Sequence, residues 1–209
     1  MNALIPTDRI PMAAPTPSHE PGSATLPARL REATEDDRPE LLALHRAALV
    51  SLSHGHYTEA QIQSLLQHVP TLDASLLADR SYLVAELDGR IVACGGWSAR
   101  TPGYLPVFGQ DRANPDKARA PLIRAMYTHP AYARRGLGRQ ILAAAERAAM
   151  SRCSQALELD ALLAGVPLYL SAGYQPLGRS SWRLPDGEEI AIVRMRQRRS
   201  QPKSGMRIV

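Results

Sequence analysis

The chain has 209 residues, 44% of them hydrophobic, and a formal net charge of +5 at neutral pH. This length supports one hydrophobic core rather than two enzyme domains, and the positive charge favours anionic partners such as nucleotides and phosphorylated cofactors. Its apolar runs fall short of the roughly 18 residues that span a bilayer, and its N-terminus lacks the apolar stretch of a secretory signal. We therefore expect no membrane association.

The first 27 residues are rich in proline and show no apolar period, which predicts a disordered extension over 1–27. The last residues, 199–209, form a basic segment that we interpret as a flexible tail, with contact to RNA as the alternative. A single domain is expected over 28–198. Two cysteines, Cys94 and Cys153, fit no metal-binding spacing, so packed thiols in a reduced, cytoplasmic protein are expected.

A strand and two helices are predicted at the start of the domain. The strand candidate is Ala28–Ala33. Thr34 and Asp37 then have the pattern of a helix N-cap with an acidic first turn, which precedes the helical run PELLALHRAALVSL. Thr58, with Gln61 three residues later, forms a capping box that opens a second helix.

A β-hairpin is the next element. Asp88-Gly89 is a strong turn signal, and it separates two apolar runs, Ser81–Leu87 and Arg90–Ser98. The segment Arg100–Lys117 is rich in proline, glycine and aspartate, so we predict a loop that covers a sheet edge or the mouth of a site.

Strands and helices alternate in the second half of the chain. A strand through APLIRAMYT ends before Pro130, a helix runs to about Ser151, and QALELDALL is a further strand. A short helix through VPLYLSAGY and a hairpin over Gln175–Arg196, turning at 185–187, complete the domain. The order β-α-α-β-β-β-α-β-α-β-β predicts an α/β fold with mostly antiparallel neighbours.

Two glycines stand where the helix after Pro130 begins. Gly136 and Gly138 have low helix propensity, but the first N–H groups of a helix form an anion site that glycines leave open to a phosphate. Arg134 and Arg135 would add positive charge to such a site. The alternative is a tight turn flanked by solvated arginines. The third glycine of a dinucleotide-binding fingerprint is absent.

The run MYTHPAYARRGLGRQILAAAERAA, followed by LELDALLAGVPLYLSAGY, resembles the acetyl-CoA-binding half of the GNAT superfamily of N-acetyltransferases. Gly136 and Gly138 match the small positions of the family's Q/R-x-x-G-x-G/A signature, whereas Ala133 departs from its usual Gln or Arg. Leu168-Tyr169 and Gly173-Tyr174 match a second family pattern. Together with the order of elements, the resemblance extends over most of the predicted domain.

The resemblance implies a central mixed, mostly antiparallel sheet flanked by helices, with a splayed pair of strands that holds the pantetheine arm of acetyl-CoA. These strands would be the one ending at Thr128 and the one through Leu157–Ala161. Acetyl-CoA is the implied cosubstrate, and no metal is implied. The implied cofactor contacts are the backbones of Met126, Tyr127 and Thr128 and the N–H groups of Arg134, Arg135, Gly136, Leu137, Gly138 and Arg139.

The resemblance also implies catalytic roles. Tyr169 would be the general acid, because a phenol with a reference pKa of about 10 can protonate a leaving thiolate whose conjugate thiol has a pKa of about 8.5. Its alternative role is that of a core aromatic. The Thr128 N–H would stabilise the oxyanion. The general base stays open among Glu158, Asp160, His54, His56 and water.

The acceptor implied is a primary amine of a small molecule or peptide, which would attack acetyl-CoA directly in a ternary complex. The alternative function is a noncatalytic CoA-binding protein or a basic RNA-associated module, although an aromatic content of 5% disfavours nucleic-acid binding. Dimerisation through the last strands, common in such folds, is left open. Aromatic residues that either line the acceptor pocket or belong to the core are Trp97, Tyr104, Phe108 and Trp182.

Overall fold

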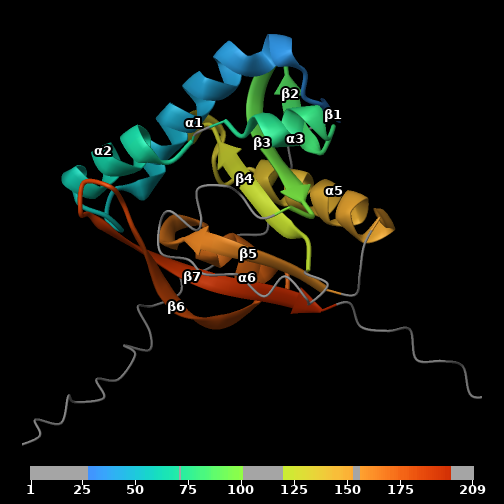
Figure 1. Ribbon diagram of the computed structural model, residues 1–209. Coiled ribbons are helices and arrows are strands. Elements are labelled where there is room, and N and C mark those ends of the chain that lie inside the picture. Colours follow the sequence, from blue (N-terminus) through green and yellow to red (C-terminus); the bar gives the residue numbers. More distant parts are fainter. Residues whose placement is uncertain (1–27, 71, 101–119, 153–155, 199–209) are drawn as a thin grey trace, which may run out of the picture.

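The described residues form one mixed sheet with helices on both faces (Figure 1). The computed structural model describes residues 28–70, 72–100, 120–152 and 156–198. The strand order is β1-β2-β3-β4-β5-β7-β6. The strands are β1 (Arg29–Glu32), β2 (Tyr82–Leu87), β3 (Arg90–Ser98), β4 (Leu122–Thr128), β5 (Ala156–Leu162), β6 (Gln175–Arg183) and β7 (Glu189–Arg198).

The helices begin where the sequence predicts, with one addition. Thr58 Oγ1 accepts from the Gln61 N–H at 3.2 Å, which confirms the capping box. The helix Ala74–Ala78 was not predicted, because five residues are too short to show a helical period. Its N-cap is Asp73, whose side chain accepts from the Ser75 N–H at 2.9 Å. The helices are α1 (Arg38–Ser53), α2 (Glu59–His68), α3 (Ala74–Ala78), α5 (Leu137–Arg152) and α6 (Val166–Ser171), with a 3-10 turn, Glu35–Asp37, before α1.

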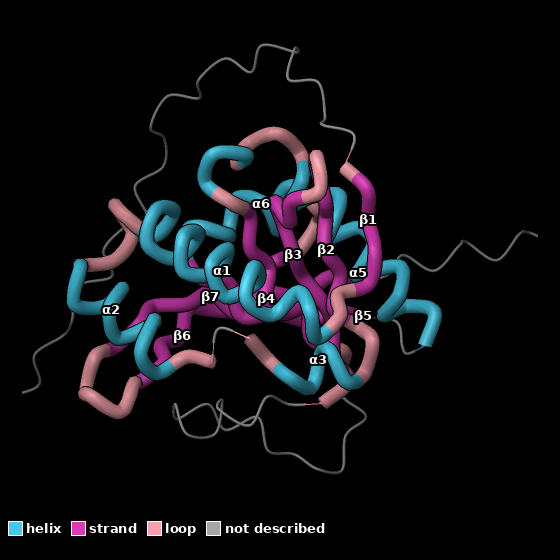
Figure 2. The backbone as a smooth tube through the Cα atoms, turned by 90° about the horizontal axis from the view of Figure 1, so that it is seen from above, coloured by secondary structure: helices cyan, strands magenta, loops and turns pink. Residues whose placement is uncertain are grey.

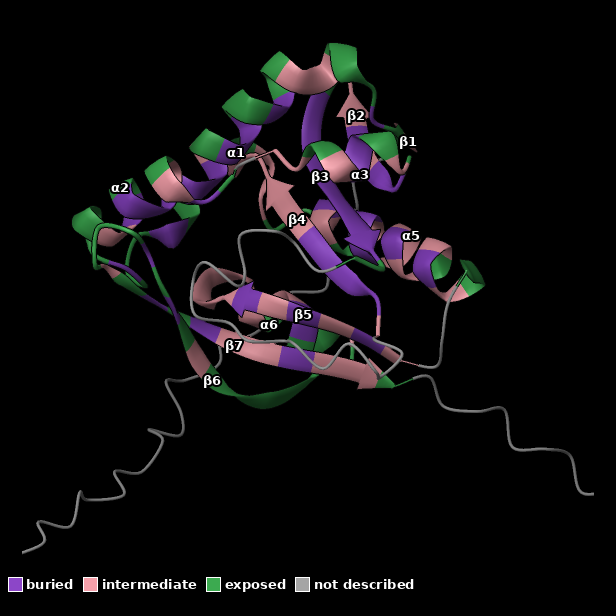
Figure 3. Cartoon of the chain, viewed as in Figure 1, coloured by how far each residue is buried: buried purple, intermediate pink, exposed green. Residues whose placement is uncertain are grey.

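Successive side chains of a strand point to opposite faces of the sheet, so the hydrophobic core has one part on each face. Val84 packs with α1 and α3, whereas its neighbour Ala85 packs with Leu137 and Ile141 of α5. Figure 2 shows α1 and α5 on either side of the central strands. Figure 3 shows that β3 is almost entirely buried between these layers, while the outer surfaces of α1 and α2 are exposed.

The C-terminal hairpin β6–β7 packs against α2. Trp182 and Ile190 share a buried cluster with Leu65 of α2. Tyr57 joins these parts, because its phenol donates to the Ala191 carbonyl at 2.6 Å and accepts from the Leu163 N–H at 2.9 Å. The hairpin turn has Gly187 at φ +93°, so the turn predicted at 185–187 is confirmed.

Strands β4 and β5 separate, as the family resemblance implies. They are the parallel neighbours of the sheet, and their register contains one pair, Leu122↔Glu158. By contrast, β5 pairs with β7 over seven positions from Ala156↔Arg198 to Leu162↔Ile192. Beyond Leu122, the register of β4 with β5 ends, and Figure 1 shows the two strands diverging.

A β-bulge lies in the middle of β4. Cys94 pairs with Tyr127 and Gly96 pairs with Arg124, so the single residue Gly95 opposes both Ala125 and Met126. Ala125 has φ +52°. A Cβ on Gly95 would overlap the Met126 thioether and lie 2.7 Å from Ile141 Cγ2, which explains the glycine.

Several predicted features lie outside the described residues. These are the N-terminal extension, the C-terminal tail, the loop from residue 101 onward with Tyr104 and Phe108, and Cys153. Cys94 is a buried free thiol. In the part of the chain that the structure describes, no helix is both long and apolar enough to cross a membrane.

Candidate active site

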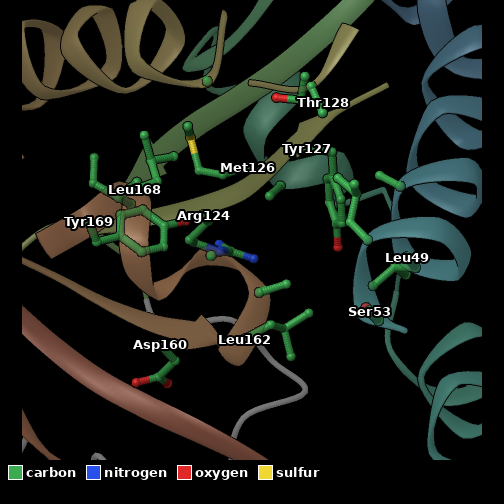
Figure 4. A pocket seen from close by; sticks show the side chains of 18 of the residues that line it. Leu49, Ser53, Arg124, Met126, Tyr127, Thr128, Asp160, Leu162, Leu168 and Tyr169 are labelled. Atoms are coloured by element: carbon green, nitrogen blue, oxygen red, sulfur yellow. The ribbon is translucent and has the colours of Figure 1, made fainter. Parts of the chain in front are cut away.

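A cavity of about 740 Å³ occupies the opening between β4 and β5. It extends from the start of α5, past α6, to α1, α2 and the β6–β7 hairpin. We call the part beside α5 the cofactor end and the part beside α1 and α2 the acceptor end. Figure 4 shows side chains of β4 and α6 facing side chains of α1 across this space.

The two glycines of the cofactor end are required for different physical reasons, one by the backbone conformation and the other by the space beside it. Gly136 has φ +80°, a backbone conformation that L side chains rarely adopt, and it turns the chain into α5. Gly138 lies within the first turn of α5 and has no such constraint. A Cβ there would lie 3.4 Å from both Leu168 Cδ2 and Thr128 Oγ1, so an alanine fits while a larger side chain would enter the cavity.

The arginines of this turn are placed differently from one another. Arg134 lines the cavity and has φ +63°, an uncommon conformation for a residue with a Cβ. Arg139 also lines it, and its guanidinium donates to the Ser171 carbonyl at 2.9 Å, which connects α5 to the end of α6. Arg135 is exposed, does not line the cavity, and lies 5.8 Å from the ring centre of Tyr132.

The backbone of Thr128 faces the opening. The His129 N–H donates to the Val92 carbonyl of β3 at 2.9 Å. Because successive backbone groups of a strand point to opposite edges, the amide of Thr128 points away from β3 and toward the opening, and that of Tyr127 points toward β3.

Tyr169 lies on α6 in the cavity wall and is 8% exposed. Its ring packs edge to face with Tyr174 at 5.8 Å between centroids. Burial raises the pKa of its phenol above the usual range, and Tyr127 acts in the same direction. Tyr169 is therefore protonated at neutral pH, and the same shift makes its phenol a weaker acid than a free tyrosine.

Near the acceptor end lie two polar side chains that the sequence analysis did not single out, Arg124 and His45, of which Arg124 lines the cavity and His45 is buried behind it. Arg124, on β4, is 8% exposed, and its guanidinium forms an ion pair with the Asp73 carboxylate. Tyr127 packs against His45 with ring centroids 4.2 Å apart, and His45 Nε2 lies 2.7 Å from Tyr82 Oη. Arg124 comes two residues after the buried Leu122 in an otherwise apolar strand, so both side chains lie on the same face of β4. This spacing is the feature of the sequence that could have indicated a buried arginine.

The candidate bases divide into those that reach the cavity and those that do not. Asp160 lines it and lies 3.6 Å from Arg194 Nε on β7. His56 also lines it and is exposed. Glu158 forms an ion pair with Arg196 at 3.2 Å, and neither Glu158 nor His54 lines the cavity.

The two described aromatic candidates for the acceptor pocket differ in whether they line the cavity. Trp182 lines the cavity at the acceptor end, whereas Trp97 belongs to the core packed on α5. Among the described residues, no cluster of three or more His, Cys, Asp or Glu side chains could hold a metal ion.

Residues 78–176 match the family model of the acetyltransferase (GNAT) domain. The matched range contains the bulged strand β4, the turn with Gly136 and Gly138 (the glycine turn), α5 and Tyr169. The chain carries a GNAT acetyltransferase domain. The enzyme class is accordingly that of the acyltransferases, as the sequence predicts. A search of curated proteins found no match.

Solved structures share the fold of this GNAT domain. A GCN5-related N-acetyltransferase from Rhodopseudomonas palustris is 22% identical with a TM-score of 0.64, over 82% of this chain and 95% of that one. The PaiA N-acetyltransferase from Thermoplasma acidophilum, in complex with coenzyme A, is 14% identical with a TM-score of 0.59, over 83% and 99%. A putative acetyltransferase from Salmonella typhimurium with its cofactor acetyl-CoA is 15% identical with a TM-score of 0.56, over 87% and 99%.

Proposed function

We propose that the chain is an N-acetyltransferase that transfers the acetyl group of acetyl-CoA to the primary amine of a small molecule or peptide. The observation that carries this proposal is the single cavity that joins the glycine turn of α5 to Tyr169 and continues to α1 and α2. One continuous space of this kind lets a cofactor and an acceptor meet for direct attack in a ternary complex.

The cofactor end fits acetyl-CoA. The first N–H groups of α5, with Arg134 and Arg139 beside them, would bind the pyrophosphate, since a helix N-terminus attracts anions. The pantetheine arm would lie along the open edge of β4 and pair with backbone groups of Met126 and Thr128. Tyr127 would contribute chiefly its side chain to the cavity wall, and Arg135 would stay at the outer rim.

The reaction then assigns roles to three groups of the chain. The amine nitrogen attacks the thioester carbon, a C–N bond forms, and the C–S bond breaks. The Thr128 N–H, which faces the opening, would stabilise the oxyanion, and the Tyr169 phenol would protonate the thiolate. The proton of the amine would pass to Asp160, to His56 or to water, since these reach the cavity.

Calorimetric titration with acetyl-CoA tests the cofactor end. We expect micromolar affinity for the wild-type chain and a loss of at least about 100-fold for Gly138→Asp, which places a negative charge in the anion site. Gly138→Ala should bind nearly as the wild type, because its Cβ has room. Gly178→Asp, at an exposed position with no heavy atom within 4 Å, is the matched control. Absence of binding by a folded wild-type chain would contradict the proposal.

A cytoplasmic location and an acceptor of small size remain part of this proposal. The buried free thiol Cys94 agrees with a reducing compartment. The acceptor would meet the reactive end of acetyl-CoA within this cavity of about 740 Å³, and a small amine or the terminus of a peptide fits such a space.

A further inference from the structure

Ser53 places a hydroxyl in the largely apolar wall of the acceptor end. It is the last residue of α1, lines the cavity and is 3% exposed. Among the described residues, its hydroxyl has no hydrogen-bond partner. A hydroxyl buried in this way has lost most of its hydrogen bonds to water and has not replaced them. The Ser53 hydroxyl is therefore available to a polar group bound in the cavity.

Tyr127 brings a second hydroxyl to the same end. His45, Leu49 and Ser53 are four residues apart, so they lie along one face of α1. The Tyr127 ring packs on this face, with its centroid 4.2 Å from that of His45 and its side chain against the cluster that contains Leu49. Figure 4 shows the phenol oxygen pointing from β4 toward the side of the cavity where Leu49 and Ser53 lie.

The phenol of Tyr127 is also without a hydrogen-bond partner in the part of the chain that the structure describes. Tyr82, on the neighbouring side of His45, differs in this respect, because its Oη lies 2.7 Å from His45 Nε2. Burial raises the pKa of Tyr127, so its phenol is neutral at pH 7. A neutral phenol oxygen accepts a hydrogen bond from an N–H group.

The bulge in β4 sets the direction of the Tyr127 side chain. Tyr127 pairs with Cys94, and residues opposite each other in an antiparallel pair share a face, so both lie on the α1 face. In a regular strand, Arg124 and Tyr127 would lie on opposite faces, since they are three residues apart. The extra residue at Ala125 leaves both on the α1 face, where they line the acceptor end.

The Tyr127 phenol lies within reach of the reacting atoms. Thr128, whose N–H is assigned to the oxyanion, is the next residue, so this N–H and the phenol are separated by little more than the length of one tyrosine side chain. A hydrogen bond of about 3 Å at each end and an approach of about 3 Å between nitrogen and carbonyl carbon span that length. An amine bonded to Tyr127 can therefore attack a thioester whose oxygen is bonded to Thr128.

The rest of the acceptor end suits a neutral, apolar body. Its apolar lining, among the residues that the structure describes, consists of Leu49, Leu52, Leu65, Val69, Leu122, Leu162 and Trp182. Its charged side chains from β4 and β5 are balanced within the protein, since Arg124 pairs with Asp73 and Asp160 with Arg194. A charged substrate body would lose its water here and disturb these pairs.

We propose that Tyr127 and Ser53 bind the amino group of the acceptor, and that the acceptor is a primary amine on a neutral, apolar body. This inference rests on the proposed acetyl transfer. A neutral primary amine has two N–H donors and one lone pair. When its N–H groups donate to the two hydroxyl oxygens, the lone pair is left for the thioester carbon. A secondary amine has one N–H, so one hydroxyl stays without its bond.

Thiol release from acetyl-CoA, measured with a set of amines, tests the acceptor class. Hexylamine and phenethylamine are the apolar primary amines, and N-methylhexylamine is the secondary amine. Aminocaproate carries an added carboxylate, and hexamethylenediamine carries an added ammonium group. We expect the wild-type chain to favour hexylamine over the secondary amine and over both charged amines by at least about 30-fold in kcat/KM.

Removal of the two hydroxyls tests the residues. Tyr127→Phe keeps the ring that packs on His45, and Ser53→Ala removes a single oxygen. Each should raise the KM for hexylamine at least about fivefold and leave the Kd for acetyl-CoA within about threefold. The double variant should prefer hexylamine to N-methylhexylamine by less than about threefold. Ser51→Ala, at an exposed position of α1 that does not line the cavity, is the matched control and should behave as the wild type.

The outcomes separate the two proposals. If the wild-type chain binds acetyl-CoA but uses the secondary or charged amines as well as hexylamine, or uses none of the amines, the inference is overturned and the cofactor site stands. A preference for the primary amine that survives in the folded double variant would overturn the roles of Tyr127 and Ser53. If the wild-type chain does not bind acetyl-CoA in the calorimetric titration, the proposed function itself fails.

Discussion

At the cofactor end the proposed contacts with acetyl-CoA are mostly with backbone groups, whereas the acceptor end is lined by residues from several elements. Gly136, Gly138 and the Thr128 amide form the first region, over a short stretch of sequence. The second region needs Leu49 from α1, Arg124 from β4 and Trp182 from β6. A backbone site constrains a few residue types locally, whereas a side-chain site can change residue by residue without altering the fold.

This difference predicts how variants divide. Changes at the cofactor end and at Tyr169 should alter acetyl-CoA affinity or the rate of the chemical step for every acceptor. Changes at the acceptor end should alter KM for the acceptor and leave acetyl-CoA affinity intact.

Tyr169→Phe should have the largest effect on the chemical step. Loss of the phenol removes the proposed proton donor, so kcat should fall about 100-fold while the Kd for acetyl-CoA stays within about threefold. Because burial raises the pKa of Tyr169, its ionisation should not reduce the wild-type rate from pH 7 up to at least about 10. Steady-state rates across this pH range measure both effects. A variant that keeps its full kcat would show that Tyr169 is a packing residue.

Gly165→Ala should have an intermediate effect through the position of the Tyr169 ring. A Cβ on Gly165 would lie 3.1 Å from Tyr169 Cε2, so the ring must shift by a few tenths of an ångström. Gly165 has φ −85°, which alanine also adopts, so the fold should be unaffected. We expect kcat to fall about tenfold with Tm within about 3 °C of the wild type.

Gly178→Ala serves as the control for that variant, because a Cβ at this exposed position has no heavy atom within 4 Å. An unchanged kcat in Gly165→Ala, beside a reduced kcat in Tyr169→Phe, would mean that the ring tolerates the shift.

Asp186→Asn should have the smallest effect, because Asp186 does not line the cavity and acts on the acceptor end only through its contacts with α2. Asp186 connects the β6–β7 turn to α2, since it accepts from Ser64 Oγ at 2.8 Å and lies 3.2 Å from His68 Nε2. The Ser64 hydrogen bond is the main cause that lowers the pKa of Asp186. A carboxyl with a lowered pKa stabilises the fold above its ordinary pKa, and that stability is lost as the pH falls through the lowered value.

Thermal unfolding from pH 7 to pH 2 should therefore show a shallower acid decline of Tm in Asp186→Asn than in the wild type. The KM for the acceptor should rise by a few-fold at most, with the acetyl-CoA Kd unchanged. A rise in the acetyl-CoA Kd would contradict the division between the two ends.

The sequence predicts those parts of the molecule that are determined by residues close together along the chain. Thr58 with Gln61 places the start of α2, Asp88-Gly89 places a hairpin turn, and the glycine turn marks the start of α5. The family resemblance adds the splay of β4 and β5.

The parts that the sequence does not predict depend on distant contacts. Helix α3 is too short for a period, and its Asp73 becomes informative only when Arg124 is seen opposite it. Strand β4 itself contains no glycine or proline that would indicate the bulge at Ala125. The residue that allows the bulge is Gly95, which lies on the neighbouring strand β3. Acceptor-site residues are for this reason harder to assign than cofactor-site residues.

The bulge at Ala125 also affects how this chain can be aligned with others. Across it, residues that share the α1 face are spaced by three, as Arg124 and Tyr127 are, whereas elsewhere in β4 they are spaced by two. An alignment that treats β4 as a regular strand is one residue out of phase on one side of the bulge and exchanges inward and outward positions there. A transplanted acceptor pocket would need this extra residue as much as it needs the side chains.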